Sequence, residues 1–518
     1  MATNNHIVWK YILVGLLFVY VPMYILLPVL GYESSVPPVL DEETYLWISE
    51  RALWNRPYDW QMPWPPYHDN GFIFAHPPGF IWWMQAVPQW LLALPWQMLL
   101  LFCVARLALA HSTYPMYIMA TWMVLPLVVL PMSRECMPDL MVTALGTYSM
   151  MLCFERLEED TSLFRFACAG MVLGLASWVK YPALFLLILA FMHMRDIRKT
   201  IVFVLGCLVP FCIAEFWLYT VYGEYHLWMV IKESAQIART SIISRTMGIV
   251  QRFWWSQGVV LVLLGVFGKA QWRLVSTLLL VVFGLAVFVN IDIIRFVYLG
   301  VAGISLGYFL DIPVLFSKNP TRVWTVWHSW IVVELVLIVT THNYVSPRYW
   351  MSVALPVCLL LYQKIQNVEK KHIMGAIHVC GALVSWLMLC TESMHAWENQ
   401  RLVQKVTEIY SQEKLLFSGE WACRYAMQQR DISAFQGYVD RGTVIVSSIN
   451  SAGWTPDTED IHNGTYTRLD RYEGRKWFLF LVHRDDSIGY YADSLGFWPM
   501  QLEFSPKAIE VVELWKKN

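Results

Sequence analysis

The feature that most constrains the fold is a series of apolar segments, each long enough to cross a lipid bilayer. A transmembrane helix needs roughly 20 predominantly apolar residues, and such segments recur from about residue 8 to residue 390. Only 15% of the 518 residues are charged, whereas soluble proteins carry about 25%. The sequence therefore predicts an all-α polytopic membrane protein with about 13 transmembrane helices.

The apolar pattern stops near residue 391 and predicts two units. Residues 1–391 form a transmembrane module, and residues 392–518 contain no run of spanning length. Two short strand-like runs, 443–448 and 476–482, lie in this second part. We therefore expect the C-terminal unit to be a small α/β domain.

Basic residues predict how the module is oriented. With a cytoplasmic N-terminus, Lys10, Arg106 and Arg156 fall on the cytoplasmic side, as the positive-inside rule requires. Because successive spans place the loops on alternating sides, the first loop (about 31–76) and the C-terminal domain are then exoplasmic. This alternation also requires 77–95 to be an interfacial helix and not a full span. The predicted location is a plasma or inner membrane.

The first loop opens with three adjacent carboxylates, Asp41, Glu42 and Glu43, and closes with His76 before two prolines. Carboxylates beside a membrane are costly and often mark function. An alternative is that they cap the helix that follows, because helix N-termini favour acidic residues. Asp139, directly after Pro138, allows the same two explanations.

Cations occur at the ends of several predicted spans on the same side, namely Arg134, Lys180 and Arg348. Long basic side chains at span ends also extend to the interface for purely structural reasons. What favours a site is that polar groups from separate segments all fall on one predicted side.

Four segments together resemble one superfamily. DEETYLWISERALW followed by FAHPPGFIWW is similar to the first-loop signature of GT-C glycosyltransferases of the protein O-mannosyltransferase and aminoarabinose-transferase type (glycosyltransferase families 39 and 83). SRECMPDLMVTAL, GLASWVKYPALFLL and SPRYWMSVALPVCLLL resemble later segments of the same superfamily in the same order.

The resemblance implies a GT-C fold and transfer of a sugar from a polyprenyl-phosphate donor to a protein, lipid or glycan acceptor. Transfer would occur on the exoplasmic face with inversion at the anomeric carbon. Asp41 would be the general base and Glu42 would support it. The implied substrate- and lipid-phosphate-binding residues are Tyr45, His76, Arg134, Asp139, Lys180, Arg348 and Tyr349.

Three positions depart from the family pattern. His76 stands where the family usually has lysine or arginine, and Thr44 stands where the aminoarabinose branch has arginine. Tyr181 and Pro182 follow Lys180 where Gly-Pro is usual. Specificity for aminoarabinose or lipid A is therefore not implied.

The remaining expectations concern partners and cofactors. A net charge of −1 gives no reason to expect nucleic acid. No obligatory cofactor or metal is predicted, although carboxylates are chemically able to hold a divalent cation. Two alternatives stay open: a lipid-linked-glycan transporter or flippase, and a non-catalytic GT-C-like subunit of an envelope-glycan complex. The sugar, the acceptor, the oligomeric state and the role of the C-terminal domain are left open.

Overall fold

The fold is taken from a computed structural model in which most helices and much of the C-terminal sheet are described. The described residues are 2–32, 42–58, 77–88, 91–125, 138–155, 162–194, 196–236, 246, 250, 253, 258–289, 292–311, 325–341, 350–365, 371–419, 423, 426–427, 429–435, 439–449, 455–457, 460, 463–477, 480–482, 501–503 and 506–518.

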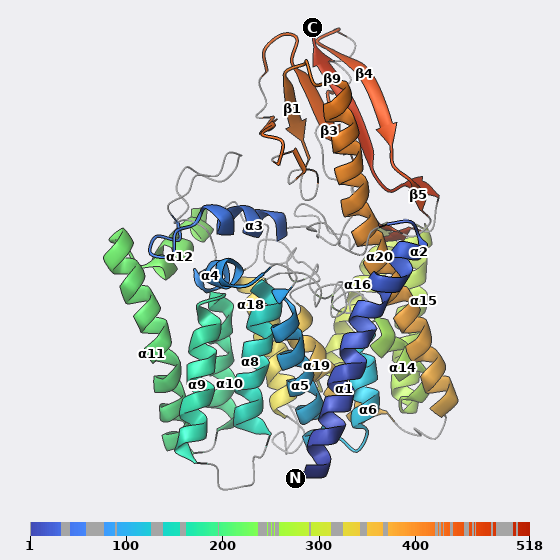
Figure 1. The fold of residues 1–518 in the computed structure, drawn as a ribbon. Helices are drawn as coiled ribbons and strands as arrows, with labels where there is room; N and C mark the ends of the chain where they lie inside the picture. The colour runs from blue at the N-terminus through green and yellow to red at the C-terminus, as the bar shows by residue number, and fades with distance from the viewer. Residues whose placement is uncertain are drawn as a thin grey trace.

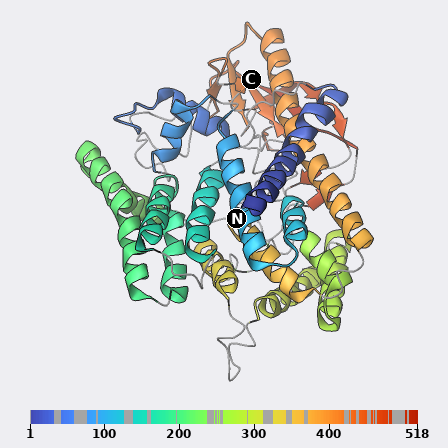
Figure 2. The same ribbon diagram turned by 60° about the horizontal axis from the view of Figure 1, so that its bottom comes forward.

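A bundle of helices forms the larger part of the molecule. The N terminus lies at one end of this bundle, and α3, α4 and α12 lie at the other, which we call the loop end (Figure 1). Helices α9 and α11 gather on one side and α14 to α16 on the other (Figure 2). The bounds are α1 (Ala2–Val21), η1 (Pro22–Leu26), α2 (Leu27–Val29), α3 (Glu42–Arg51), α4 (Gly79–Ala86), α5 (Leu94–His111), α6 (Pro115–Met123), α8 (Pro138–Phe154), α9 (Leu163–Ser177), η4 (Tyr181–Leu186), α10 (Leu187–His193), α11 (Ile197–Tyr222), α12 (His226–Gln236), α14 (Gly258–Phe267), α15 (Ala270–Val289), α16 (Asp292–Phe309), α18 (Val326–Thr341), α19 (Met351–Lys364) and α20 (Lys371–Ile409).

Within the described residues, four helical segments are long and apolar enough to cross a membrane: His6–Val29, Leu94–His111, Ile197–Tyr222 and Lys371–Ile409. Five further apolar helices are 10–17 residues long. The chain therefore has the helices of an integral membrane protein, although these segments do not establish the predicted number of about 13. Helix α4 has only eight residues, too few to span a bilayer alone.

Helix α11 illustrates how the sequence sets helix bounds. The Asp196 side chain caps its first turn by accepting a hydrogen bond from the Arg198 amide at 2.9 Å. The helix ends at Gly223, whose φ of 79° is the left-handed conformation that glycine adopts most readily. The chain then turns at the loop end and continues directly into α12.

Helices α9 and α11 pack closely because glycines face the partner backbone. A Cβ atom on Gly170 would lie 2.1 Å from the Phe203 carbonyl oxygen, and one on Gly206 would lie 2.6 Å from that of Ala167. Small residues commonly allow such approaches between membrane helices. The contact brings the end of α9, and the turn that follows it, beside α11.

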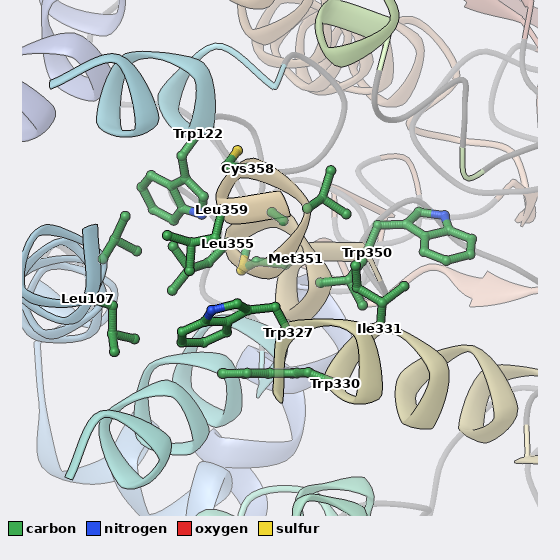
Figure 3. Close-up of a cluster of buried hydrophobic side chains, with 14 of the residues drawn as sticks. Leu107, Trp122, Trp327, Trp330, Ile331, Trp350, Met351, Leu355, Cys358 and Leu359 are labelled. Atoms are coloured by element: carbon green, nitrogen blue, oxygen red, sulfur yellow. The ribbon is translucent and has the colours of Figure 1, made fainter. Parts of the chain in front are cut away.

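A core of large side chains joins α5, α6, α18 and α19 (Figure 3). Trp327 and Trp330 of α18 stack with ring centroids 6.2 Å apart. Trp330 and Trp350 are fully buried. Because Trp330 also lines the cavity described below, this core forms part of the wall of the candidate site.

The C-terminal domain contains a five-stranded sheet with strand order β2-β1-β3-β9-β4. Strand β1 runs parallel to β2 and β3, whereas β9 is antiparallel to β3 and β4. Side chains alternate, so Val444 and Val446 pack toward α20 while Ile445 packs beside Trp515 on the other face. The bounds are β1 (Leu415–Ser418), β2 (Ser433–Ala434), β3 (Val444–Ser448), β4 (Tyr466–Glu473) and β9 (Val511–Lys517), with the pairs β5 (Lys476–Trp477) and β8 (Lys507–Ala508), and β6 (Phe480–Val482) and β7 (Gln501–Glu503).

The two units share one helix. The predicted boundary at residue 391 falls inside α20, which continues to Ile409 and packs Leu402 and Val406 into the core of the domain. Polar contacts cross the junction: the Trp477 indole donates to Thr391 Oγ1 at 3.0 Å, and Arg475 donates to the Leu30 carbonyl at 3.0 Å. The domain is therefore held against the loop end of the bundle.

The glycine contact predicts a stability effect. Replacing Gly170→Ala should destabilise the protein by about 1–3 kcal/mol, because the added methyl group forces α9 away from α11. The measurement is the midpoint of thermal unfolding in detergent. Gly300→Ala in α16 is the matched control, because nothing lies within 4 Å of its Cβ position. Equal midpoints for the two variants would contradict the close packing.

Candidate active site

A short turn between α9 and η4 carries the central cation of the candidate site. Helix α9 ends at Ser177, and the extended backbone of Lys180 (φ −159°, ψ 123°) precedes η4. Pro182 stands in the first turn of η4, where its fixed φ fits a helix start. This break in the helical path lets Lys180 and Tyr181 reach different neighbouring helices.

Lys180 forms a buried ion pair with Asp139. The Nζ atom lies 2.7 Å from Asp139 Oδ1, and the two residues are only 8% and 6% exposed. Asp139 also occupies the first turn of α8, where the helix dipole favours a carboxylate. The helix-start explanation and the site explanation for Asp139 are therefore compatible.

A cavity of about 60 Å³ opens beside this ion pair. Its polar lining includes Asp139, Lys180, Glu334 and Ser352. Its apolar lining comes from α8, η4 and α18, namely Val142, Gly146, Pro182, Ala183, Leu186, Trp330, Leu337 and Ile338. A ligand pocket usually has about 300–1,000 Å³, so this cavity has room for a polar group of a ligand and not for a whole sugar.

Glu334 is a site residue that the sequence reading missed. It is 8% exposed and lies in α18, an otherwise apolar helix. The carboxylate forms a hydrogen bond with the Ser352 side chain and interacts electrostatically with Lys180. An acidic residue inside a spanning helix is rare and usually functional, and that signal was available in the sequence VVELVL.

Helix α4, which follows the first loop, covers the turn that carries Lys180. The Gly79 amide of α4 donates to the Trp178 carbonyl at 2.9 Å, and a Cβ atom on Gly79 would lie 2.7 Å from that oxygen. Trp82 packs against Trp178 with ring centroids 5.8 Å apart. Gly79, which follows the double proline, therefore permits this close approach because it has no side chain.

The structure brings together only some of the predicted site residues. Asp139 and Lys180 meet in the cavity. Tyr45 lies elsewhere: it is buried in the core and packs edge-on against Phe80 at 5.1 Å. Glu42 begins α3, but its side chain is outside the described part of the structure. The remaining predicted residues, Asp41, His76, Arg134, Arg348 and Tyr349, also lie outside the described residues.

Among the described residues, no group of three or more His, Cys, Asp or Glu side chains is placed to hold a metal ion. The absence of an obligatory metal stays a prediction from sequence. The polar groups of the cavity are two carboxylates, one ammonium and hydroxyls. Such a set can hold a proton, a hydroxyl group or a phosphate oxygen.

Comparison with known proteins gives a fold-level likeness. No family model matches the chain, and no curated protein matches it. Two crystal structures of ArnT from Cupriavidus metallidurans do: one bound to undecaprenyl phosphate (13% identity, 95% of this chain and 99% of that one) and one in the apo state (14%, 96% and 100%). The TM-score is 0.43 for each. A likeness at this level carries no conclusion about the family or activity of this chain.

The buried ion pair predicts that replacing one partner costs more stability than replacing both. Lys180→Met should destabilise the protein by about 3–5 kcal/mol, because Asp139 would be left as an uncompensated buried charge. The double variant Lys180→Met with Asp139→Leu should recover most of that loss. Thermal unfolding midpoints of the single and double variants test the coupling. Purely additive effects would argue against a coupled pair.

Proposed function

We propose that this protein is an integral-membrane glycosyltransferase that takes a sugar from a polyprenyl-phosphate donor. The observation that carries the proposal is the buried Lys180–Asp139 ion pair, which lies in a cavity at the loop end of an apolar bundle. Buried charge in a spanning module is costly and usually serves function. The four-segment resemblance to GT-C enzymes supplies the reaction class.

The lining of the cavity supports a lipid-linked donor. The lining contains both charged groups and apolar side chains such as Leu186, Leu337 and Ile338. A donor with a polar phosphate and a prenyl chain presents the same two chemistries. Its chain remains in lipid while its head group reaches the loop end, where α3 and α4 lie.

Lys180 is the proposed anchor for the leaving phosphate. A lysine ammonium has three N–H donors, so it can contact Asp139 and a phosphate oxygen at the same time. A charge-assisted hydrogen bond to the departing oxygen strengthens as negative charge develops in the transition state. His76, Arg134, Arg348 and Tyr349 are the proposed additional contacts, from the sequence resemblance.

The proposed reaction is one displacement at the anomeric carbon. Asp41, supported by Glu42, takes the proton from the acceptor hydroxyl. The acceptor oxygen then forms a bond to the anomeric carbon, with inversion, as the bond to the phosphate oxygen breaks. The polyprenyl phosphate leaves toward Lys180. The acceptor side is proposed to be exoplasmic, with a cytoplasmic N-terminus in a plasma or inner membrane.

Asp41→Asn tests the proposal directly. This change keeps the size of the side chain and removes the base, so transfer should fall by ~100-fold or more. The measurement is release of polyprenyl phosphate from radiolabelled polyprenyl-phosphate sugars by purified protein in liposomes. Undecaprenyl-phosphate sugars are suitable first donors.

Asp440→Asn is the control, because Asp440 is an exposed residue of the C-terminal domain that pairs with Lys414. It should retain wild-type turnover. Full activity of Asp41→Asn would make Asp41 a helix cap and contradict the site. A wild type that turns over no donor in a broad set would favour a transporter or a non-catalytic subunit.

A further inference from the structure

A second buried polar cluster lies on the other side of the turn that carries Lys180. It consists of Tyr181 of η4, Glu215 of α11 and His226 of α12, which are 9%, 6% and 0% exposed. The Tyr181 hydroxyl hydrogen-bonds to Glu215 Oε1, and it lies 2.7 Å from His226 Nδ1. The mechanism proposed above gives these residues no role.

The hydrogen bonds define a consistent arrangement of protons. A tyrosine hydroxyl has one proton to donate, and its hydrogen bond to Glu215 uses that proton. The Nδ1–H of His226 then donates to the Tyr181 oxygen. The second carboxylate oxygen of Glu215 accepts from the Leu227 amide at 3.1 Å. Glu215 thus holds Tyr181 and the first turn of α12 at once.

The cluster also contacts the first loop. The His226 ring stacks on Tyr58, with centroids 4.8 Å apart and planes 6° apart. The Tyr58 amide donates to the Tyr222 hydroxyl at 2.9 Å. Tyr58 follows α3 in the first loop and is itself buried. Four separate segments, namely η4, α11, α12 and the first loop, therefore meet in this cluster.

The backbone before Lys180 is fixed as well. The Trp178 indole donates to the Pro210 carbonyl of α11 at 2.8 Å. The Trp178 carbonyl in turn accepts from Gly79 of α4. Lys180 thus lies between two anchored neighbours, Trp178 and Tyr181. Its ammonium position relative to Asp139 depends on both anchors.

We propose that Tyr181, Glu215 and His226 are positioning residues that hold Lys180 in the candidate site, and that docking of the first loop and α12 completes this hold. The catalytic part of the inference rests on the proposed glycosyltransferase function. When Tyr58 and α12 are in place, the His226 ring is fixed and Tyr181 is locked to Glu215. Lys180 then points at Asp139 and at the phosphate that it is proposed to bind.

Tyr181→Phe is the test, since it removes only the hydroxyl. The first readout does not depend on activity: the rate at which an amine-reactive reagent modifies Lys180 in the purified full-length protein, measured by mass spectrometry. We expect several-fold faster modification. The second readout is kinetic, and kcat should fall by ~10-fold or more with little change in KM for the acceptor, because a misplaced catalytic group mainly slows the chemical step.

Tyr362→Phe is the matched control. Its hydroxyl is also buried and forms a hydrogen bond with Thr121 at 2.8 Å, and Thr121 in turn contacts a histidine. Tyr362 lies near the end of α19, whereas Ser352, which lines the cavity, lies at its start. The Tyr362→Phe variant should lose comparable stability and leave Lys180 modification and kcat unchanged. Glu215→Gln keeps an acceptor oxygen for Tyr181 and should be affected less than Glu215→Ala.

The outcomes separate the two proposals. If Lys180 in the Tyr181→Phe variant is modified at the wild-type rate, the positioning role is overturned. This conclusion holds whether or not the protein is active as an enzyme. Faster modification in Tyr362→Phe as well would also overturn it, since a general loss of packing would then explain the effect. An inactive wild type with faster modification only in Tyr181→Phe would reject the glycosyltransferase and leave the hold on Lys180 established.

Discussion

The buried ion pair between Lys180 and Asp139 is the interaction on which the rest of the site depends. In an apolar bundle each charge alone would be costly to bury, so the helices must present both groups within hydrogen-bonding distance. Asp139 is placed at the loop end because α8 begins there. Lys180 is placed beside it because α9 ends at Ser177 and a new helical segment, η4, begins after Lys180.

Helix packing explains why that turn is in place. Glycines let α9 approach α11 closely, so the end of α9 arrives beside Pro210 and Glu215. From the loop end, α4 reaches the same turn through Gly79, which has no side chain to obstruct the contact. Helices α4, α9 and α11 are therefore joined at the turn that carries Lys180.

The sequence predicted the class of fold and part of the site, for physical reasons. Apolar runs specify spanning helices directly, and polar residues at span ends identified Asp139 and Lys180. Glu334 was missed although an acidic residue in an apolar segment is itself a signal in the sequence. Glu215 and His226 were missed because each is a single polar residue whose partners lie on other segments, and only the tertiary packing reveals such contacts. The strand expected over 476–482 is divided in the structure between β5 and β6, which pair with different strands.

The charged residues that line the cavity bear on which further groups the proposed donor phosphate would need. In the described lining of the cavity, Lys180 is accompanied by two acidic residues, Asp139 and Glu334. On the proposed function, a donor phosphate would therefore need further hydrogen-bond donors besides Lys180. Arg134 and Arg348, which precede Asp139 and Ser352 by five and four positions in the sequence, are the candidates that the sequence resemblance supplies. On the proposed function, a Lys180 held in place beside Asp139 would keep one of its three N–H donors available for the leaving phosphate.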